Sequence, residues 1–528
     1  MNITLNNNLG FSWSKTDTIS FKGYFYIKND FYEKQKAIDY LSKIKTKTNF
    51  KDFLKTINGV FTIIINTEKN SFIASDITRS FAVFYTLQNN ELFLSDDIFY
   101  LKNTFNLNNF DALSEIEFKA TNHTHGKKTL LQKVHQVQAS EYLIVKNDTI
   151  IERDFFYTYA IEKESSNPYS MLKEKATIAF ENAFGRFVES LNNRTIVVPL
   201  SGGFDSRLIA VMLKKHNYKN VVCYTYGRKN SFEIENSKKT AKALGFQWFF
   251  IEYNSKIIKN YLETDAFKKY AHFAGKLSSM PYLQEYFAVK YLKENKLIAL
   301  NSIFVPGYAG DFLGGSQFLK VIPEGLKKTK IISLLISKKF SNHQLSKSAK
   351  KVIKQEIEKT LIQIDGNYKR KIPSSVFEDY DLKEKIAKYI FNSANFYTYF
   401  GFEHRFPFWD KELLDFFKKV PVKYKLMKIL FDDVLINNYF KPYNVCFKTE
   451  IQPSEKIIYI QKIKDKIKPI LPTYVKQKIL EKNDWHYYKA ITNQMLNWLK
   501  LKGVKVQRLS KNYNEVITQW YLYFSKKE

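Results

Sequence analysis

Length, composition and charge already exclude several classes of protein. With 528 residues, of which 45% are hydrophobic, the chain is long enough for two or three domains with sizeable cores. Two cysteines cannot form a disulfide framework, and no apolar run approaches the roughly 20 residues that cross a membrane. The net charge of +31 would suit a polyanion, but the lysines are spread along the chain, so we favour a compositional bias and do not expect a nucleic-acid partner.

The first residues, MNITLNNNLGFSW, lack the basic and apolar segments of a signal peptide, so we expect a cytoplasmic protein. The sequence up to about residue 155 is predicted to be mostly β, because short β-branched and aromatic runs such as VFTIIIN, SFIAS, FAVFYTL and EYLIV alternate with polar turns. One helix is predicted around residues 32–45. This part of the chain should form a smaller domain, residues 1–155, that precedes the rest.

The segment TIVVPLSGGFDSRLIA, residues 195–210, is the most informative one. A β-branched strand leads into a glycine turn and then a helical pattern. Gly202 and Gly203 let backbone N–H groups approach a phosphate closely, and the helix adds the positive end of its dipole. Ser201 and Ser206 can donate hydrogen bonds. Asp205 would repel a bare phosphate, so it fits best as a ligand of Mg²⁺ held between phosphates.

Further strand and helix patterns extend this unit. VVCYTYG at 221–227 is a predicted strand, residues 232–244 a helix, and WFFI at 248–251 a third strand. Repeated β-α units predict a doubly wound parallel sheet, an α/β fold that binds ligands at the carboxyl ends of its strands.

A second glycine-rich loop, PGYAGDFLGGS, follows the apolar residues 303–305. It carries Asp311 among glycines at the end of a predicted strand. Mg²⁺ in proteins is held by one or two carboxylates together with phosphate oxygens. Asp311 is therefore the expected second ligand beside Asp205.

The remainder is predicted to be largely helical. Residues 320–369 are rich in lysine and serine and are expected to be exposed, as an insertion or a lid. In GFEHRFPFWD, His404 is expected at the surface, and Arg405 is either structural or a ligand of phosphate or carboxylate. Residues 451–528 are expected to form a helical C-terminal extension.

LSGGFDSR resembles the PP-loop of the ATP pyrophosphatases, and with GYAGDFLGG further along it resembles the asparagine synthetase family. The resemblance implies a synthetase domain at 170–450 that cleaves ATP to AMP and pyrophosphate and converts a carboxylate into an acyl-adenylate. It implies ATP and Mg²⁺ as cofactors, with Mg²⁺ on Asp205 and Asp311. The nucleotide contacts that it implies are Leu200, Ser201, Gly202, Gly203, Asp205, Ser206, Tyr226 and Gly307.

Two catalytic residues are also implied by the resemblance. Lys448 lies in a loop comparable to one whose lysine stabilises the departing pyrophosphate. Tyr308 stands where asparagine-forming members carry glutamate and β-lactam synthetase carries tyrosine. A tyrosine could act as a base only with a lowered pKa or beside another acid.

The segment GVFTIIINTEKNSFIASDITRSFAVFYTLQNNELFLSDDI resembles the glutaminase (class II amidotransferase, N-terminal-nucleophile-like) domain of the same family. The family's nucleophile is an N-terminal cysteine, whereas this chain has Asn2 and no cysteine before Cys223. We therefore expect a degenerate domain without glutaminase activity. Ammonia or an amine, from solution or from a separate glutaminase, would supply the nitrogen.

The expected function is an ATP-dependent amide-forming ligase. Three alternatives stay open at this point: a true asparagine synthetase that uses free ammonia, an RNA-modifying PP-loop enzyme, and a non-catalytic ATP-binding partner protein. The carboxylate could be a small molecule such as aspartate, a sugar uronate or a peptide. A homodimer is one possible assembly.

Overall fold

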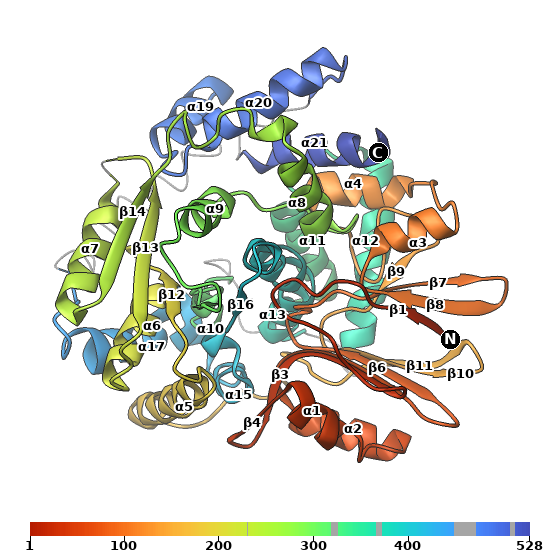
Figure 1. The fold of residues 1–528 in the computed structure, drawn as a ribbon, viewed down its shortest axis with the longest axis horizontal. Coiled ribbons are helices and arrows are strands. Elements are labelled where there is room, and N and C mark those ends of the chain that lie inside the picture. The colour runs from red at the N-terminus through yellow and green to blue at the C-terminus, as the bar shows by residue number, and fades with distance from the viewer. Residues whose placement is uncertain (230, 318–325, 366–371, 448–470, 507–512, 528) are drawn as a thin grey trace.

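The computed structural model describes residues 1–229, 231–317, 326–365, 372–447, 471–506 and 513–527 (Figure 1). Two sheets lie in the N-terminal part and one in the middle of the chain. The N-terminal strands are β1 (Asn2–Thr4), β2 (Ser14–Lys15), β3 (Ile19–Ile27), β4 (Asp30–Glu33), β5 (Asn58–Asn66), β6 (Ser71–Ser75), β7 (Phe84–Gln88), β8 (Glu91–Ser95), β9 (His135–Gln136), β10 (Glu141–Lys146) and β11 (Thr149–Phe155).

The N-terminal strands form a four-stranded sheet, β1-β8-β7-β9, and a seven-stranded sheet, β11-β10-β6-β5-β3-β2, with β4 paired to β3. An apolar layer that includes Ile64, Ile73, Tyr85 and Leu94 joins residues of both sheets in one core cluster. Such a layer covers one face of each sheet, which is the packing expected of a β-sandwich.

Helices accompany this sandwich, which corrects the prediction of a single helix around residues 32–45. They are α1 (Lys34–Leu41), α2 (Lys47–Thr56), α3 (Ile98–Thr104) and α4 (Ala112–Thr121). In α2, Phe50, Phe53 and Leu54 follow the i, i+3, i+4 spacing of a buried helix face, and the Thr46 side chain accepts a hydrogen bond from the N–H of Asn49.

A five-stranded parallel sheet lies at the centre of the second part, in the order β14-β13-β12-β15-β16. Its strands are β12 (Ile196–Pro199), β13 (Val221–Gly227), β14 (Gln247–Glu252), β15 (Ile303–Phe304) and β16 (Glu403–His404). Helix α7 lies on one side of the sheet and α9 on the other (Figure 1). This confirms the doubly wound α/β fold. The strand order reverses between β12 and β15, and such a switch point is where these sheets bind ligands.

The helices of the second part confirm its largely helical character. They are α5 (Tyr169–Glu189), α6 (Phe204–Lys215), α7 (Phe232–Leu244), η1 (Tyr261–Glu263), α8 (Asp265–Gly275), α9 (Tyr286–Glu294), α10 (Gly310–Leu313), α11 (Lys328–Lys339), α12 (Lys347–Asp365), α13 (Ser374–Asp381), the π-helical η2 (Leu382–Ile390), η3 (Phe391–Ala394), α14 (Asn395–Tyr399), η4 (Pro407–Trp409), α15 (Lys411–Phe417), α16 (Val422–Lys425), η5 (Leu426–Lys428), α17 (Ile429–Val434), the π-helical η6 (Leu435–Phe440), α19 (Thr473–Lys482), α20 (Tyr488–Leu501) and α21 (Asn514–Lys527). In the described part of the chain, none of the helices combines the length and the apolar character needed to cross a bilayer.

Two expectations for the region after residue 320 change in the structure, those for residues 320–369 and for His404. Helix α11 is not simply exposed, because its Ile331, Ile332 and Leu335 belong to an apolar cluster shared with α12 and α13. His404 is buried rather than at the surface, packed against Phe406 and two rings of the N-terminal part, and burial lowers its pKa to about 3. Arg405 is also buried and donates a hydrogen bond to Glu403 Oε2 at 3.1 Å, which favours the structural one of the two roles predicted for it.

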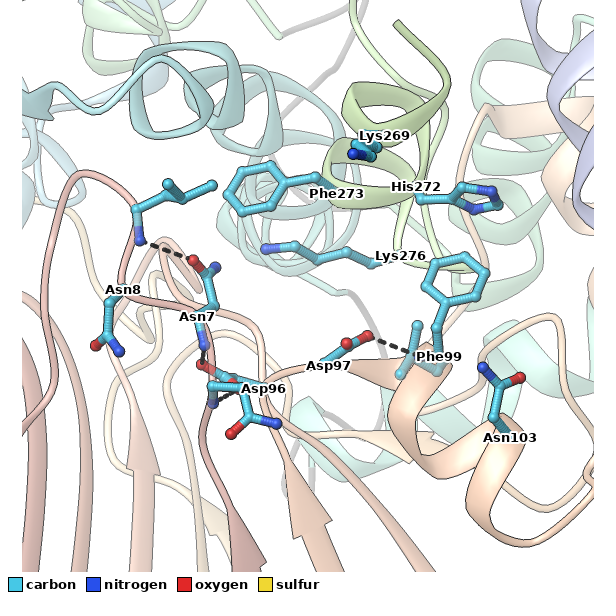
Figure 2. Close-up of a pocket in the computed structure, with 13 residues that line it drawn as sticks. Asn7, Asn8, Asp96, Asp97, Phe99, Asn103, Lys269, His272, Phe273 and Lys276 are labelled. Carbon is cyan, nitrogen blue, oxygen red and sulfur yellow. Dashed lines mark hydrogen bonds between the residues drawn. The ribbon is translucent and has the colours of Figure 1, made fainter. Parts of the chain in front are cut away.

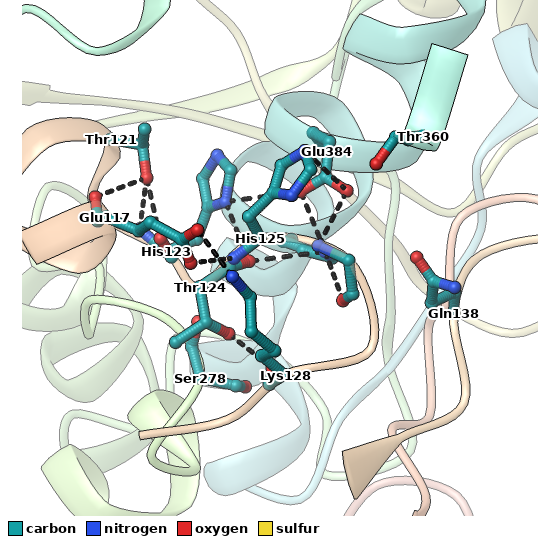
Figure 3. Close-up of polar contacts among 12 residues, drawn as sticks. Glu117, Thr121, His123, Thr124, His125, Lys128, Gln138, Ser278, Thr360 and Glu384 are labelled. Carbon is teal, nitrogen blue, oxygen red and sulfur yellow. Dashed lines mark hydrogen bonds and ion pairs between the residues drawn. The ribbon is translucent and has the colours of Figure 1, made fainter. Parts of the chain in front are cut away.

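A buried ionic cluster ties the N-terminal part to the helices of the second part. Glu384 of η2 accepts a hydrogen bond from Lys388 at 2.8 Å. It lies 3.7 Å from His123 and 3.9 Å from His125 (Figure 3). Lys388 also donates to the carbonyl oxygen of Gly126 at 2.7 Å. Burial is the largest single effect and would raise the pKa of Glu384, but the charge and hydrogen bond of Lys388 together with His125 and His123 outweigh it and hold that pKa at about 2.

Glu384→Gln is expected to destabilise the protein by about 3–5 kcal/mol, because it leaves the buried Lys388 ammonium without its counter-charge. Unfolding in urea should show a lower midpoint. Lys359→Met is the matched control, since it breaks only the exposed pair with Glu356 and should cost no more than about 0.5 kcal/mol. Equal midpoints for Glu384→Gln and wild type would contradict the role given to this cluster.

Candidate nucleotide-binding site

A pocket of about 430 Å³ opens at the switch point of the parallel sheet, where β12, β13 and β15 end. It gathers most of the residues that the sequence singled out. Those lining it are Leu200, Ser201, Gly203, Asp205, Ser206, Tyr226, Gly307, Tyr308 and Asp311. Gly202 belongs to the same turn without lining the pocket, and Lys448 lies outside the described residues.

The turn between β12 and α6 is held by its own serines. Ser201 Oγ accepts a hydrogen bond from the Gly203 N–H at 3.1 Å, and Ser206 Oγ accepts one from the Ser201 N–H at 3.1 Å. No side chain caps the first turn of α6, whose N-cap residue is Gly203. Unpaired N–H groups at a helix start are the donors that bind phosphate.

Arg207 fixes this turn from behind. Its buried guanidinium donates to the Gly202 carbonyl oxygen at 2.7 Å and to the Val445 carbonyl oxygen at 3.0 Å, and it lies 4.5 Å from the centre of the Phe447 ring. Arg207 thereby connects the turn to residues 445–447, which directly precede Lys448 in the sequence.

The Asp311 loop lies directly on the turn. The Asp311 N–H donates to Asp205 Oδ2 at 3.0 Å. A Cβ atom on Gly310 would lie 2.8 Å from Asp205 Cγ, and one on Gly307 would lie 2.8 Å from the Ser206 nitrogen. Both positions therefore require glycine, and this contact sets the relative position of the two acids.

Gly310→Ala is expected to displace the Asp311 loop and to lower any ATP-dependent activity by about 10²-fold, the cost of a misplacement near 1 Å. Ala309→Gly is the control in the same loop. Ala309 has a φ of 49°, a left-handed conformation that glycine adopts without strain, so activity should persist. The rate of pyrophosphate release measures the activity of both variants. Full activity in Gly310→Ala would show that the close contact does not matter.

The two carboxylates form a donor set that fits Mg²⁺. Burial raises the pKa of Asp205, and the charge of Asp311 raises it further, while Lys428 opposes both. A divalent cation between the acids would relieve this repulsion. Within the described chain no group of three or more His, Cys, Asp or Glu side chains could hold a metal alone. Two carboxylates are nevertheless sufficient where phosphate oxygens complete the shell.

The opposite end of the pocket is aromatic. Tyr226 stacks on Tyr253 at 5.4 Å between ring centres, and its hydroxyl accepts a hydrogen bond from Gln284 Nε2 at 3.1 Å. His486, from the C-terminal helical region, lies 3.3 Å from Gln284 Nε2 and also lines the pocket. Next to it, the Trp485 carbonyl oxygen accepts a hydrogen bond from the Arg228 N–H at 2.7 Å. Flat rings with an amide nearby can accommodate a nucleotide base.

A buried carboxylate lies in the same pocket. Glu285 is only 3% exposed, and its Oε1 accepts hydrogen bonds from the hydroxyls of Tyr224 and Tyr397, the latter at 2.8 Å. Burial raises the pKa of Glu285 to about 7, although both tyrosines lower it. The pKa of Tyr308 is instead raised well above its usual value, by burial and by the charge of Glu285. Tyr308 therefore does not meet the condition of a lowered pKa.

Residues 195–279 match the family model of the queuosine biosynthesis protein QueC. This local match, together with the turn geometry, agrees with the resemblance of the segment to a PP-loop of the ATP-pyrophosphatase type. A 7-cyano-7-deazaguanine synthase of Sulfurihydrogenibium sp. (strain YO3AOP1) is 40% identical over 63 residues, which is 12% of this chain and 28% of that protein. The chain thus spans little more than a quarter of the curated relative that it matches.

Solved structures show only distant likeness. The NH3-dependent NAD synthetase from Campylobacter jejuni gives a TM-score of 0.20 at 17% identity, over 39% of this chain and 99% of that one. The glutamine phosphoribosylpyrophosphate amidotransferase from B. subtilis gives 0.19 at 10% identity, over 56% of this chain and 63% of that one. The assignment of the fold therefore rests on the strand order of the parallel sheet and not on these structures.

Four residues around the PP-loop were not found by sequence reasoning: Gln284, Glu285, Lys428 and His486. Gln284 and Glu285 follow a turn that carries no motif. Lys428 is one lysine among many, and it lies 3.0 Å from Asp432. His486 lies far from the PP-loop along the chain. Only the fold brings these side chains to the pocket.

Proposed function

We propose that the chain is an amide-forming ligase of the asparagine synthase type. It would cleave ATP to AMP and pyrophosphate, activate a carboxylate as an acyl-adenylate, and transfer ammonia or an amine to it. The observation that carries the proposal is the seating of the Asp311 loop on the PP-loop, which brings two acids, a phosphate-binding turn and Glu285 to one pocket.

The nucleotide would lie across this pocket. The open N–H groups of α6 and the hydroxyls of Ser201 and Ser206 would bind the β- and γ-phosphates, with the base beside Tyr226. Asp205 and Asp311 would hold Mg²⁺, which when bound neutralises phosphate charge. The chain's own contribution is to hold the α-phosphate where a carboxylate oxygen can attack it.

A cation is needed where charge develops on the leaving pyrophosphate. Lys448 was proposed from the sequence resemblance, and Arg207 joins the PP-loop to the segment just before it. Lys428 already lines the pocket and acts on the charge of Asp205. We propose that Lys428 shares this role with Lys448.

Glu285 is the proposed general base of the second step. It would accept a proton as the nitrogen attacks the acyl carbon and AMP leaves, and its pKa of about 7 suits that task. Tyr308, at the same pocket wall, would help to place the acyl group rather than act as the base. The N-terminal part lacks a cysteine nucleophile, so the nitrogen would come from free ammonia, an amine or a separate glutaminase.

The test is pyrophosphate release from MgATP across a panel of aspartate, uronates and peptide carboxylates, with ammonia and with amines. Release that depends on one carboxylate would support the ligase and name its substrate. Release with aspartate and ammonia would make the protein an asparagine synthetase. Formation of 7-cyano-7-deazaguanine should be assayed in parallel, because the matched relative bears that activity in its name.

A further inference from the structure

A second cavity, of about 760 Å³, lies between the N-terminal part and α8, and none of its lining residues lines the nucleotide pocket. Its walls come from residues 6–9, from α3 and the two residues before it, and from α8 with the residue that follows it (Figure 2). It is therefore a separate space to which the ligase proposal assigns no role.

Lys276 is the buried cation of this cavity. The residue is 8% exposed, and in Figure 2 its side chain extends across the pocket between Phe273 and Asp97. Its ammonium donates to Asn395 Oδ1 at 3.1 Å. In the described part of the chain it forms no ion pair with an acid. A buried ammonium without a counter-charge is costly.

The backbone holds this lysine at a further cost. Lys276 and Leu277 have φ angles of 48° and 46°, a left-handed conformation that side chains other than those of Asn and Asp rarely adopt. The strain is maintained by two hydrogen bonds, from the Leu130 N–H to the Leu277 carbonyl oxygen at 2.7 Å and from the Leu277 N–H to the Tyr521 hydroxyl at 3.1 Å. Strained residues that their surroundings fix in place are concentrated at binding sites.

The acids of the cavity are engaged elsewhere. Asp96 accepts hydrogen bonds from the N–H groups of Asn6 and Asn7 and from Trp13 Nε1. These bonds hold the loop of residues 6–9 in place. Asp97 caps α3 through the Phe99 N–H at 2.9 Å. The ammonium of Lys276 contacts the Asn395 amide oxygen and the Phe273 ring but no acid within the described residues, so it favours an anionic ligand, while nearby Asp97 disfavours a doubly charged phosphate.

The rest of the wall is suited to an uncharged organic body. The rings of Phe99 and Phe273 offer apolar surface, and the amides of Asn7 and Asn103 offer hydrogen bonds. We propose that this cavity binds a small organic carboxylate whose apolar body lies against these rings and whose carboxylate pairs with Lys276.

Benzoate is a suitable probe, titrated calorimetrically into the full-length protein without ATP. Saturable binding is expected, and Lys276→Met should weaken it about 10- to 100-fold through loss of a charge-assisted hydrogen bond. Lys268→Met, in the same helix but outside the cavity wall, should leave it unchanged. Benzamide, the neutral analogue, and phenyl phosphate, the dianion, should both bind more weakly than benzoate.

A second readout serves if Lys276→Met does not fold. Burial, followed by the charges of Arg79 and Lys22, lowers the pKa of Lys276 to about 7, while Asp96 and Asp97 oppose this. Benzoate affinity of the wild type should therefore fall as the pH rises from 6 to 8.5. His272 and Lys269 also line the cavity and could titrate, so they need control variants. His272→Gln and Lys269→Met should both retain the fall of affinity with pH. No binding of benzoate, equal binding of benzamide, tighter binding of phenyl phosphate, or an affinity independent of pH would overturn the proposal. None of these outcomes would affect the ligase proposal, which concerns the other pocket.

Discussion

Asp205→Asn is expected to reduce pyrophosphate release by at least about 10²–10³-fold, the loss typical when one group that stabilises transition-state charge is removed. The side chain keeps its size and can still accept the Asp311 N–H through its amide oxygen. Only the charge that would hold Mg²⁺ between the phosphates is lost. Initial rates with saturating MgATP and the carboxylate found by the panel measure the effect.

The same variant should be at least as stable as the wild type, which separates a functional loss from a folding defect. Burial and Asp311 raise the pKa of Asp205, so its ionisation opposes folding. In the absence of Mg²⁺ the wild type should therefore lose stability as the pH rises from the unfolded-state pKa of about 4 toward the higher folded-state pKa. Asp205→Asn should not show this slope. A stable variant with unchanged pyrophosphate release would remove Asp205 from the mechanism.

Glu285→Gln is expected to slow amide formation by about 10²–10⁴-fold, the usual contribution of a general base, while carboxylate-dependent exchange of pyrophosphate into ATP continues. The reason is that Glu285 acts only after the adenylate has formed. Because a base must be ionised, wild-type amide formation should rise with pH through about 7. When rates are compared at a constant concentration of unprotonated ammonia or amine, amide formation by the Gln variant should lack that rise. Quenched-flow sampling of amide and AMP separates the two steps.

Tyr397→Phe is the matched control for that assignment. It removes a hydrogen bond that lowers the pKa of Glu285 and keeps the ring. The rise of activity should therefore move to higher pH without a change in the exchange reaction. If exchange and amide formation fell together in Glu285→Gln, the residue would be needed for nucleotide binding instead, and the base would have to be sought elsewhere.

The parallel sheet and its binding edge could be predicted because local sequence determines them. A β-branched strand, a glycine turn and a helix start lie within residues 195–210, and the sheet order then places Asp311 opposite Asp205. The requirement for Gly310 could not be predicted, because it arises from contact with Asp205 across a long stretch of chain.

Burial in the folded protein explains the other differences between the sequence-based predictions and the structure. His404 has polar neighbours in sequence, yet the junction of the two parts encloses it among aromatic rings. Glu285 has no motif around it, and its raised pKa comes from burial in the folded protein. The boundaries predicted at residues 155, 170 and 450 stay predictions.

The proposed reaction cleaves ATP between the α- and β-phosphates at the Asp205–Asp311 pocket. The most direct measurement is ³¹P NMR of products from MgATP, the carboxylate panel and ammonia, with wild type and Asp205→Asn side by side. We expect AMP and pyrophosphate in equal amounts from the wild type with one carboxylate, and unreacted ATP from the variant. ADP and inorganic phosphate, or equal AMP formation by both proteins, would contradict it.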